Sequence, residues 1–401
     1  MSYMFSIGMD FNERVETPPL LKFPYIYACT DHYGNMGLST AYNLDSRKAM
    51  VGEFIERQYF SSFHTGKISG LLKENTSSNL YQSLLCLLEQ TSERTTAYLD
   101  SYEFDLSPCL NLFEGRKEYI PSVLFSLGNH KDAHLVPHRD SCGSSSHLCP
   151  DKALNVALLE FVERQCLLAS WLFNRCSFLI TTDPIQDLQH SDPRIRFIKD
   201  LSMVGNIYLA DISLGLSGYV VLAVFSSFSS EAHVQFSIGC AAALKPMDAV
   251  IKALVEMYQS YVLMMGMHSS VDKTLYERER HKHMKLARNF GDRNDTKTVD
   301  DFGFFTTKGI KAQKLRDYIA SPPLEVEDIL IGLRSISENL LYYTNSFAYG
   351  NHVHIVSKIF NPDFYVIMDN EGKINFTNKY SSFLNIDINA MSNKLKPLPF
   401  A

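Results

Sequence analysis

The sequence predicts an α+β fold with α/β-like alternation, in which mixed sheets are backed by helices. Three long segments have helical periodicity without internal proline, and segments rich in β-branched and aromatic residues separate them. The helical segments share a spaced acidic pattern, which indicates degenerate repeats of one strand-and-helix unit. Such alternation places helices against the faces of sheets.

Apolar spacing predicts the helices, and the second one also has a clear start. Pro150 suits a first helical turn, and Asp151 interacts favourably with the positive end of the helix dipole. A fourth segment, after Pro323, restores the same spacing. Helices are therefore expected at 46–63, 152–173, 247–265 and 324–347.

Strands are predicted where β-branched and aromatic residues gather between turn signals. Asn370, Glu371 and Gly372 are expected to form a hairpin turn inside the last of these segments. The expected strands are 120–128, 206–214, 218–228, 233–240, 352–360 and the two arms of 363–376.

Composition excludes several classes of function. The 401 residues are 45% hydrophobic, enough for a substantial core. A net charge of -6 gives no general attraction to nucleic acid or to an anionic membrane. The longest apolar run, 219–225, is too short to span a membrane, and the first residues do not resemble a secretory signal. We therefore expect a cytoplasmic protein without nucleic-acid or membrane partners.

Two of the helices carry pairs of glutamates three residues apart, Glu53 with Glu56 and Glu160 with Glu163. Such pairs lie side by side on one helix face. The simplest interpretation is neutralisation by the arginines at i+4 from the first acids, Arg57 and Arg164, at about 0.2–0.5 kcal/mol per pair.

The apolar surroundings of the second pair favour a different role. The helix around Glu160 is apolar on nearly every side, which predicts burial. Buried carboxylates are costly unless they are paired or bind a metal, and Mg²⁺ prefers carboxylate oxygens together with substrate phosphates. We therefore predict a magnesium–nucleotide site, with Arg57 and Arg164 available to phosphate. The segment "HTGKISG" at 64–70 does not have the spacing of a Walker loop.

Three separated segments resemble the YcaO family, and they occur in the order of that family's motifs. "KAMVGEFIER" is similar to its first motif, "DSCGSSSHLCPDKALNVALLEFVERQ" to its second, and "AVIKALVEMYQS" to its third. "NLFEGRKEYIP" and "NPDFYVIMDNEGKINFTNK" extend the resemblance to one branch of the family, the cyclodehydratase subunits of microcin B-type azole peptide synthetases. The stretch "RDSCGSSSH" at 139–147 could bring backbone amides close to an anion at a helix start, but considered alone it favours a plain Ser-rich surface loop.

The resemblance implies a YcaO ATP-binding fold and a set of site residues. Metal ligands are implied at Glu53, Glu56, Glu160 and Glu163, and contacts to ATP at Arg57, Ser145, Arg164, Glu256 and Gln259. Catalytic roles are implied for Glu160 and Glu163 and for the C-terminal tail, at Pro399 and Ala401.

The implied organisation is a single domain over residues 1–401. An N-terminal edge (1–45) precedes three acidic-helix units (46–265) and an exposed charged segment (266–300). The domain then continues with a helix and a C-terminal hairpin (301–384). It ends in a proline-containing tail that reaches the active site (385–401). The chain departs from the family at Tyr261, where an arginine is usual, and Arg278 or Arg280 is a candidate replacement.

The implied activity is ATP-dependent cyclodehydration in a bacterial cytoplasm. Cys, Ser or Thr side chains of a ribosomally made precursor peptide would become thiazolines and oxazolines, because phosphorylation turns the amide-derived oxygen into a good leaving group. The implied partners are a leader-recognising subunit that resembles ubiquitin-activating enzymes and an FMN-dependent azoline dehydrogenase. Thioamide or macroamidine formation, and a non-catalytic nucleotide-binding scaffold, remain as alternatives.

Overall fold

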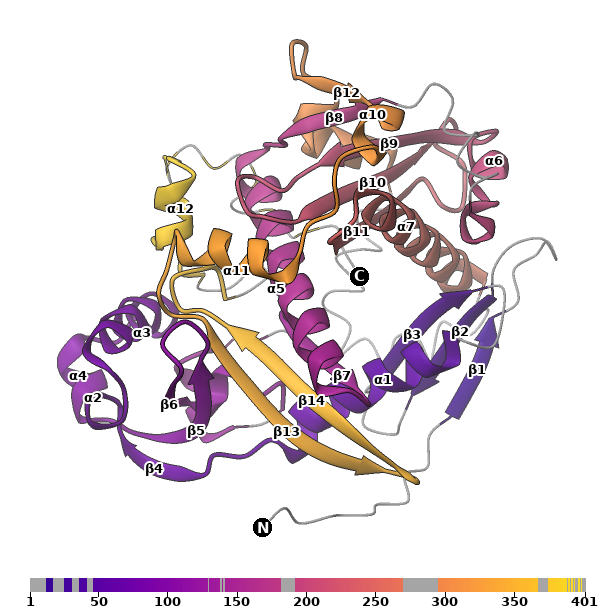
Figure 1. Ribbon diagram of the computed structural model, residues 1–401. Helices are drawn as coiled ribbons and strands as arrows, with labels where there is room; N and C mark the ends of the chain where they lie inside the picture. Colours follow the sequence, from indigo (N-terminus) through magenta and orange to yellow (C-terminus); the bar gives the residue numbers. More distant parts are fainter. Residues whose placement is uncertain are drawn as a thin grey trace.

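The structure of the protein is a computed structural model, and Figure 1 shows the arrangement of its elements. No helix in its described part has both the length and the hydropathy needed to cross a membrane. The described residues are 12–16, 25–30, 36–41, 46–128, 130–137, 139, 141–181, 192–269, 295–366, 374–387, 389, 391, 393, 396 and 398.

Three sheets form the framework. A small antiparallel sheet contains β1 (Asn12–Glu16), β2 (Tyr25–Thr30) and β3 (Met36–Ala41). The six-stranded sheet has the order β4-β5-β13-β14-β7, with β6 paired to β5, and its strands are Ile68–Leu71, Glu103–Asn111, Leu341–Tyr349, His352–Phe360, Ser144–His147 and Arg116–Pro121. The five-stranded sheet has the order β11-β10-β9-β8-β12, from Phe236–Ala243, Tyr219–Ser227, Gly205–Asp211, Phe178–Thr181 and Ala312–Lys314.

Helices cover and connect these sheets. The longer ones are α1 (Ser46–Gln58), α3 (Ser78–Ser92), α5 (Pro150–Phe173), α7 (Pro246–Ser269) and α11 (Val326–Arg334). A π-helical turn at Tyr59–Phe63 extends α1. The short helices are α2 (Leu72–Asn75), α4 (Thr96–Ser101), α6 (Ile198–Leu201), α10 (Leu315–Ile319) and α12 (Lys379–Phe383).

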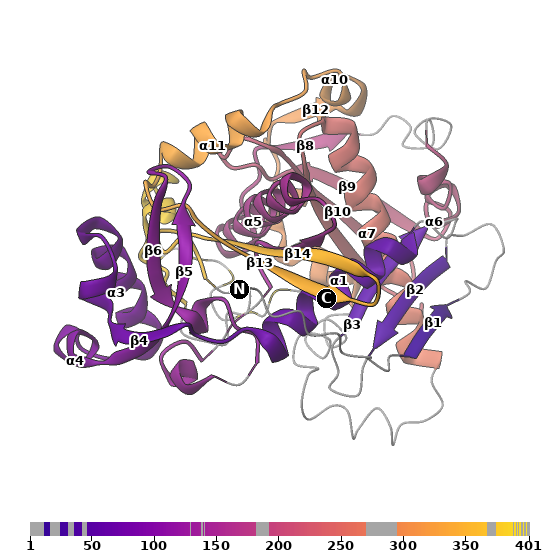
Figure 2. The same cartoon turned by 60° about the horizontal axis from the view of Figure 1, so that its bottom comes forward.

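Helix α5 occupies the centre of the molecule, between the two larger sheets (Figures 1 and 2). Its apolar residues form one core with the inner face of the five-stranded sheet. Helix α7 packs on the outer face of that sheet and forms a second core there. A third core joins α1, α3 and the six-stranded sheet. Strands β10 and β11 are covered on both faces and are buried along almost their whole length.

Most predicted elements are confirmed, together with the α+β class. The helices at 46–63, 152–173 and 247–265 correspond to α1 with its π-helical turn, α5 and α7, and α5 begins at Pro150 as expected. The strands expected at 206–214, 218–228, 233–240 and 352–360 correspond to β9, β10, β11 and β14.

Three predictions of secondary structure are wrong over the described residues. The segment 324–347 is only half helical, since α11 ends at Arg334 and β13 begins at Leu341. Within the segment 120–128, β6 ends at Pro121 and a 3₁₀ turn follows, because proline has no N–H to donate to a neighbouring strand. Residues 363–366 and 374–376 form turns and coil instead of strands. The turn expected at 370–372 lies outside the described residues.

Candidate active site at the edge of the five-stranded sheet

The acidic residues of α5 and α7 meet at the free edge of β11. Among the described residues β11 is the last strand of its sheet, so one edge of its backbone has no neighbouring strand there. Glu163 Oε2 accepts a hydrogen bond from the Ala242 backbone N–H at 3.1 Å, and Glu256 Oε2 accepts one from Cys240 N–H at 3.1 Å. Two carboxylates from different helices are therefore fixed side by side on one strand.

Gly239 makes the close approach of α7 possible. A Cβ atom at this position would lie 2.2 Å from the Ala253 carbonyl oxygen and 2.2 Å from the Met257 nitrogen, both of the α7 backbone. Any side chain at 239 would push the helix away from β11. Glycine here is therefore a condition for the contact between Glu256 and the strand.

Glu256 is a buried acid in an unfavourable environment for its charge. Burial is the largest influence on its pKa, and the nearby Glu163 and Glu53 add to it, so that the pKa rises to about 8. Burial also raises the pKa of Glu163, although Arg164 and the hydrogen bond from Ala242 oppose this. The influence of Glu53 on Glu256 shows that α1 reaches the same site as α7.

Helix α1 supplies Glu53 and Glu56. Glu53 forms an ion pair of 2.7 Å with Arg57, both partly exposed, and such an i,i+4 pair contributes about 0.3–0.5 kcal/mol. Glu56 is only 8% exposed. Burial and the charge of Glu53 raise its pKa to about 8, while Arg57, Lys358 and Arg164 act in the opposite direction.

Arg164 on α5 links the acids of all three helices. Its Nε lies 3.5 Å from Glu163 Oε1 and 3.9 Å from Glu160 Oε1, where Glu160 is about one-fifth exposed. Burial lowers the pKa of Arg164, but Glu163, Glu256 and Glu160 outweigh it and raise the pKa above its ordinary value. The single positive charge of Arg164 therefore offsets part of the negative charge of several carboxylates.

This donor set fits a divalent cation. Carboxylates outnumber the cationic side chains around them, and burial raises the pKa of Glu56, Glu163 and Glu256 because it disfavours their charged form. Carboxylate oxygens are the ligands that Mg²⁺ prefers, and its charge would remove the mutual repulsion of these acids. The predicted metal ligands Glu53, Glu56, Glu160 and Glu163 thus lie at one site, together with Glu256.

The other residues considered for contact with the nucleotide differ in burial and in their partners. Gln259 lies on α7, three residues after Glu256, and is half-buried. Ser145 on β7 faces α5, where its hydroxyl donates to the Ala153 carbonyl at 2.7 Å. Tyr261 packs the edge of its ring against Phe225, 5.2 Å between centroids, and therefore does not replace an arginine.

Several predicted residues lie outside the described residues. These are Pro399 and Ala401 of the tail, and the candidate cations Arg278 and Arg280. Of the tail (385–401), residues 385–387, 389, 391, 393, 396 and 398 are described. Trp171 Nε1 of α5 donates to the Lys396 carbonyl at 3.1 Å, and Leu398 is 2% exposed in the core around α5. The tail therefore follows the central helix at these two positions.

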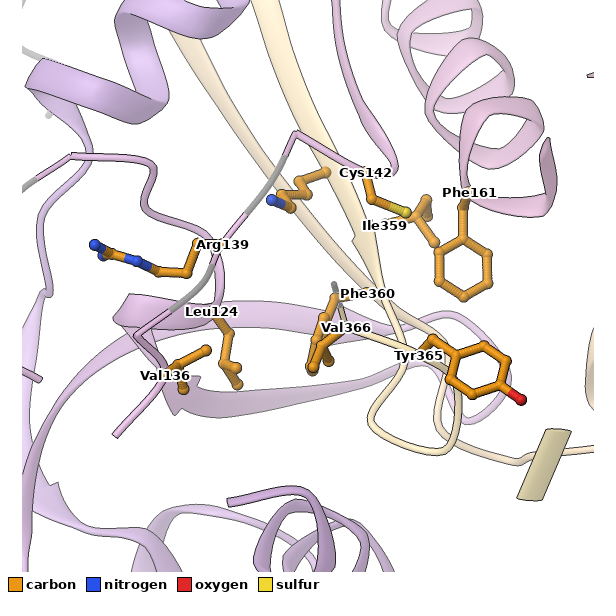
Figure 3. Close-up of a pocket in the computed structure, with 10 residues that line it drawn as sticks. Leu124, Val136, Arg139, Cys142, Phe161, Ile359, Phe360, Tyr365 and Val366 are labelled. Carbon is orange, nitrogen blue, oxygen red and sulfur yellow. The ribbon is translucent and has the colours of Figure 1, made fainter. Parts of the chain in front are cut away.

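A cavity of about 20 Å³, lined in part by Phe161 of α5 and Phe360 of β14, has room for one water molecule. Figure 3 shows Arg139 on one side of it and Phe161 and Tyr365 on the other. Gln165, next to Arg164 on α5, donates to the Tyr365 carbonyl at 2.8 Å and so fixes one wall. The lining also includes Cys142 and Lys358. Sequence reasoning missed Lys358; the signal was a lysine inside the otherwise apolar strand "IVSKIF".

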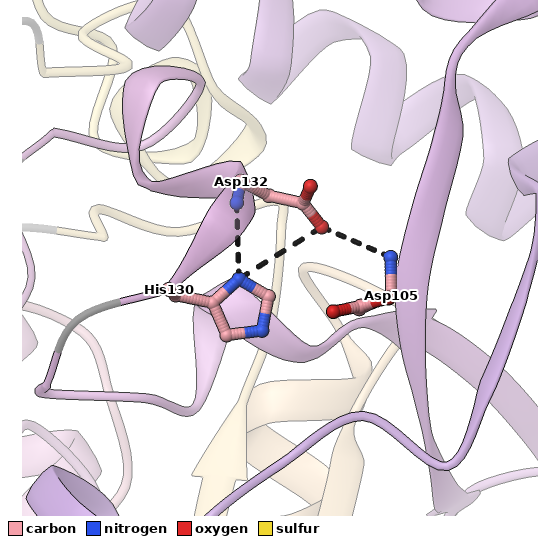
Figure 4. A group of neighbouring side chains, drawn as sticks. All are labelled: Asp105, His130 and Asp132. Carbon is pink, nitrogen blue, oxygen red and sulfur yellow. Dashed lines mark hydrogen bonds and ion pairs between the residues drawn. The ribbon is translucent and has the colours of Figure 1, made fainter.

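A second acidic cluster, Asp105, His130 and Asp132, has atoms close enough for a metal ion (Figure 4). Its atoms are already used within the protein. Asp132 accepts hydrogen bonds from Tyr102 Oη at 2.8 Å and from the Asp105 backbone N–H at 3.0 Å. His130 Nδ1 accepts from Asp132 N–H, and Lys131 pairs with Asp105 at 2.7 Å. This cluster fixes the turn at 131–134 against β5.

Comparisons with known proteins show the family of the chain. The sequence model of the family described as YcaO cyclodehydratase, ATP- and Mg²⁺-binding, matches residues 40–336. The microcin B17-processing protein McbD of Escherichia coli is 26% identical over 347 residues, which cover 84% of this chain and 83% of that protein.

Two solved structures have a similar fold. One is a chain of the E. coli microcin synthetase McbBCD complex with pro-MccB17 bound, with a TM-score of 0.82, 23% identity and coverage of 97% of this chain and 96% of that chain. The other is YcaO from Methanopyrus kandleri bound with AMPPCP and Mg²⁺, with a TM-score of 0.55, 13% identity and coverage of 88% and 85%. On the family match, the chain belongs to the YcaO cyclodehydratase family, which binds ATP and Mg²⁺.

Proposed function

We propose that this chain is the ATP-dependent cyclodehydratase subunit of a synthetase that forms thiazolines and oxazolines in a ribosomally made peptide. The observation that carries the proposal is the meeting of Glu56, Glu163 and Glu256, from three helices, at one buried site. The five glutamates Glu53, Glu56, Glu160, Glu163 and Glu256 are buried or half-buried, and a bound divalent cation would offset their mutual repulsion. The likeness to McbD and to the McbBCD complex supports the choice of reaction.

Different residues of the chain would bind the metal ion and the phosphate groups. Glu53, Glu56, Glu160 and Glu163 would hold Mg²⁺ through carboxylate oxygens. Arg57 and Arg164 would bind phosphate oxygens, since a guanidinium fork matches them. Ser145, Glu256 and Gln259 would line the nucleotide site, and Pro399 and Ala401 of the tail would complete it.

Bound Mg-ATP supplies the phosphoryl group that makes the amide oxygen a good leaving group. The protein's part is to orient the peptide amide, to keep bulk water away and to neutralise charge as it develops. The buried position of α5 suits this task, because electrostatic interactions are stronger away from water.

The proposed setting is a complex in a bacterial cytoplasm. By likeness to the McbBCD complex with its bound pro-MccB17, the partners would be a precursor peptide and two further subunits. The family resemblance implies that these are a leader-recognising subunit resembling ubiquitin-activating enzymes and an FMN-dependent azoline dehydrogenase.

Reconstitution tests the function directly. The protein, its two partner subunits, the precursor peptide and Mg-ATP are combined, and the peptide is weighed by mass spectrometry. We expect the loss of one water per ring. Phosphate release that depends on the peptide but leaves its mass unchanged would contradict cyclodehydration.

A matched pair of variants tests the assignment of the site. Glu160→Gln should lower ring formation by at least about 100-fold, because a metal ligand is lost, while the complex still assembles. Glu327→Gln, an exposed acid on α11, should leave the rate unchanged. Full activity of Glu160→Gln would show that Glu160 is not part of the site.

A further inference from the structure

The C-terminal tail is anchored at the end of helix α5. That helix ends at Phe173, and the last four carbonyl groups of a helix have no partner inside it. Asn393 supplies donors for two of them. Its side-chain Nδ2 donates to the Trp171 carbonyl at 2.9 Å, and its backbone N–H donates to the Leu172 carbonyl at 3.5 Å. A residue that lies 222 positions after Trp171 in the chain therefore caps the central helix.

The side chain of Asn393 also binds a second helix end. The 3₁₀ helix η6 (Thr296–Asp301) ends beside α5, and Asn393 Nδ2 donates to the Asp301 carbonyl at 2.9 Å. An amide nitrogen has two N–H donors, so both are used. Asn393 is 2% exposed. One buried amide therefore joins the ends of two helices to the tail.

Lys396 makes two contacts further along the tail. Its carbonyl accepts a hydrogen bond from Trp171 Nε1 at 3.1 Å, and its ammonium forms an ion pair with the Asp301 carboxylate. Trp171 is fully buried, with its ring 4.8 Å from the ring of Phe302. Leu398 is buried in the core around α5. The tail is thus held on α5 at positions 393, 396 and 398.

These contacts give the direction of the tail. The carbonyls bound by Asn393 point out of the C-terminal end of α5. Side chains on a helix lean toward its N-terminus, so the indole of Trp171 lies over the preceding turn. Between Asn393 and Lys396 the tail therefore runs along α5 toward Arg164.

The chain that follows Lys396 is long enough to reach the acidic site. Trp171 follows Arg164 by seven residues, which is about 10 Å along a helix. Five residues follow Lys396, and an extended chain of that length spans up to about 17 Å.

We infer that Asn393 is a positioning residue, which directs the end of the chain along α5 toward the acidic site by capping α5 and η6 together. The ion pair of Lys396 with Asp301 and the indole of Trp171 keep the tail in this direction. The inference rests on the proposed function, in which the last residues complete the nucleotide site. It deepens that function by naming the residues that hold them there.

Asn393→Ala in the reconstituted complex tests the inference. Without the cap the tail is no longer held in one place, and kcat for ring formation should fall about 100-fold, the effect of a displacement of about 1 Å at an active site. The Kd for Mg-ATP should change far less than kcat, because the proposed metal ligands belong to α1 and α5.

Asn389→Ala is the matched control. Asn389 lies in the same tail and is exposed, and among the described residues it forms a hydrogen bond only through its backbone N–H, which donates to Asp387. The rate of this variant should equal that of the wild type.

The fluorescence of the full chain alone gives a readout of the tail that does not depend on the reaction. Trp171 is the only tryptophan in the sequence, and its indole donates to the tail. In Asn393→Ala its emission should shift to longer wavelength and be quenched more strongly by acrylamide. Asn389→Ala should change neither property.

The ion pair provides a second test, which also serves if Asn393→Ala does not fold. Lys396→Met should lower kcat about two- to fivefold, the effect expected from one exposed ion pair. Asp301→Lys combined with Lys396→Asp restores the pair with exchanged charges and should recover most of the rate. Lys308→Met, at an exposed lysine, should have no effect.

Three results for a folded Asn393→Ala would overturn the inference: a normal kcat, a loss of Mg-ATP affinity as large as the loss of rate, or unchanged fluorescence of Trp171. If that variant does not fold, a normal rate in Lys396→Met or no recovery in the double variant would do so.

The wild-type arm separates this inference from the proposed function. A wild-type complex that removes no water from the peptide contradicts the proposed function, whereas the fluorescence comparison still shows whether Asn393 holds the tail.

Discussion

Glu56 and Glu256 bind protons more tightly in the folded protein than in an unfolded chain. Burial is the main cause for both, and it raises each pKa from 4.5 to about 8. Between these values the folded state holds more protons, so the free energy of unfolding falls as pH rises. Each carboxyl contributes a slope of up to about 1.4 kcal/mol per pH unit.

Thermal unfolding without Mg²⁺ should therefore show a Tm that decreases from pH 4.5 to 8. The Tm of the double variant Glu56→Gln, Glu256→Gln should change less between pH 4.5 and 8. At pH 8 the variant should be more stable than the wild type. Mg²⁺ with ATP should raise the Tm of the wild type most at high pH, and should do little for the variant. An identical pH dependence in both proteins would mean that these acids are not buried as described.

The serine loop shows the limit of residue-level prediction. The sequence and its resemblance indicated Ser145, whereas strand alternation turns Ser144 toward α1 and Lys358. Which of two adjacent residues faces a site depends on the register of β7 with β14, and no local pattern specifies that register.

At the scale of elements, Gly239 gives a direct test of the contact between α7 and β11. Gly239→Ala places a methyl group 2.2 Å from backbone atoms of α7, so the helix must move and carry Glu256 with it. We expect Mg-ATP binding to weaken by at least about tenfold, because metal sites tolerate little displacement of their ligands. Calorimetry on the folded variant measures this.

Gly309→Ala is the matched control. Both positions lose glycine, but at 309, where φ is +86°, a Cβ would lie within 4 Å of no described residue beyond its two neighbours in the chain. The control should lose about 1 kcal/mol of stability, because alanine is unfavourable in a left-handed backbone conformation. Its affinity for Mg-ATP should not change. Similar binding in the two variants would show that α7 does not need this contact.

Local periodicity was sufficient for the elements that build the site. Helices α1, α5 and α7 follow their apolar spacing closely. The error at 324–347 arose where helical spacing ends at Arg334 and the aromatic run "LLYYTNSF" begins. That run forms β13, which pairs with β14 through the two-residue loop Gly350–Asn351, with φ of +56° at the glycine. Gly-Asn is a hairpin signal that favoured the correct assignment.

For the whole molecule, the site depends on contacts between segments about a hundred residues apart. The sequence shows that α1, α5 and α7 carry acids, but only the packing of the three cores brings these acids together. The resemblance to a family supplied what periodicity lacks, namely that the helices share one site. The edge of β11, which anchors Glu163 and Glu256, has no signal in the sequence.

Because the three helices share one cation site, Mg-ATP should stabilise them together. We expect hydrogen exchange to slow in α1, α5 and α7 at once, since a bound ion would draw carboxylates from all three. Helix α3, which belongs to the core of the six-stranded sheet and lies at one side in Figure 1, is the internal control and should be unaffected. ATP with a chelator should protect none of them. Protection limited to one helix would contradict a site built from three.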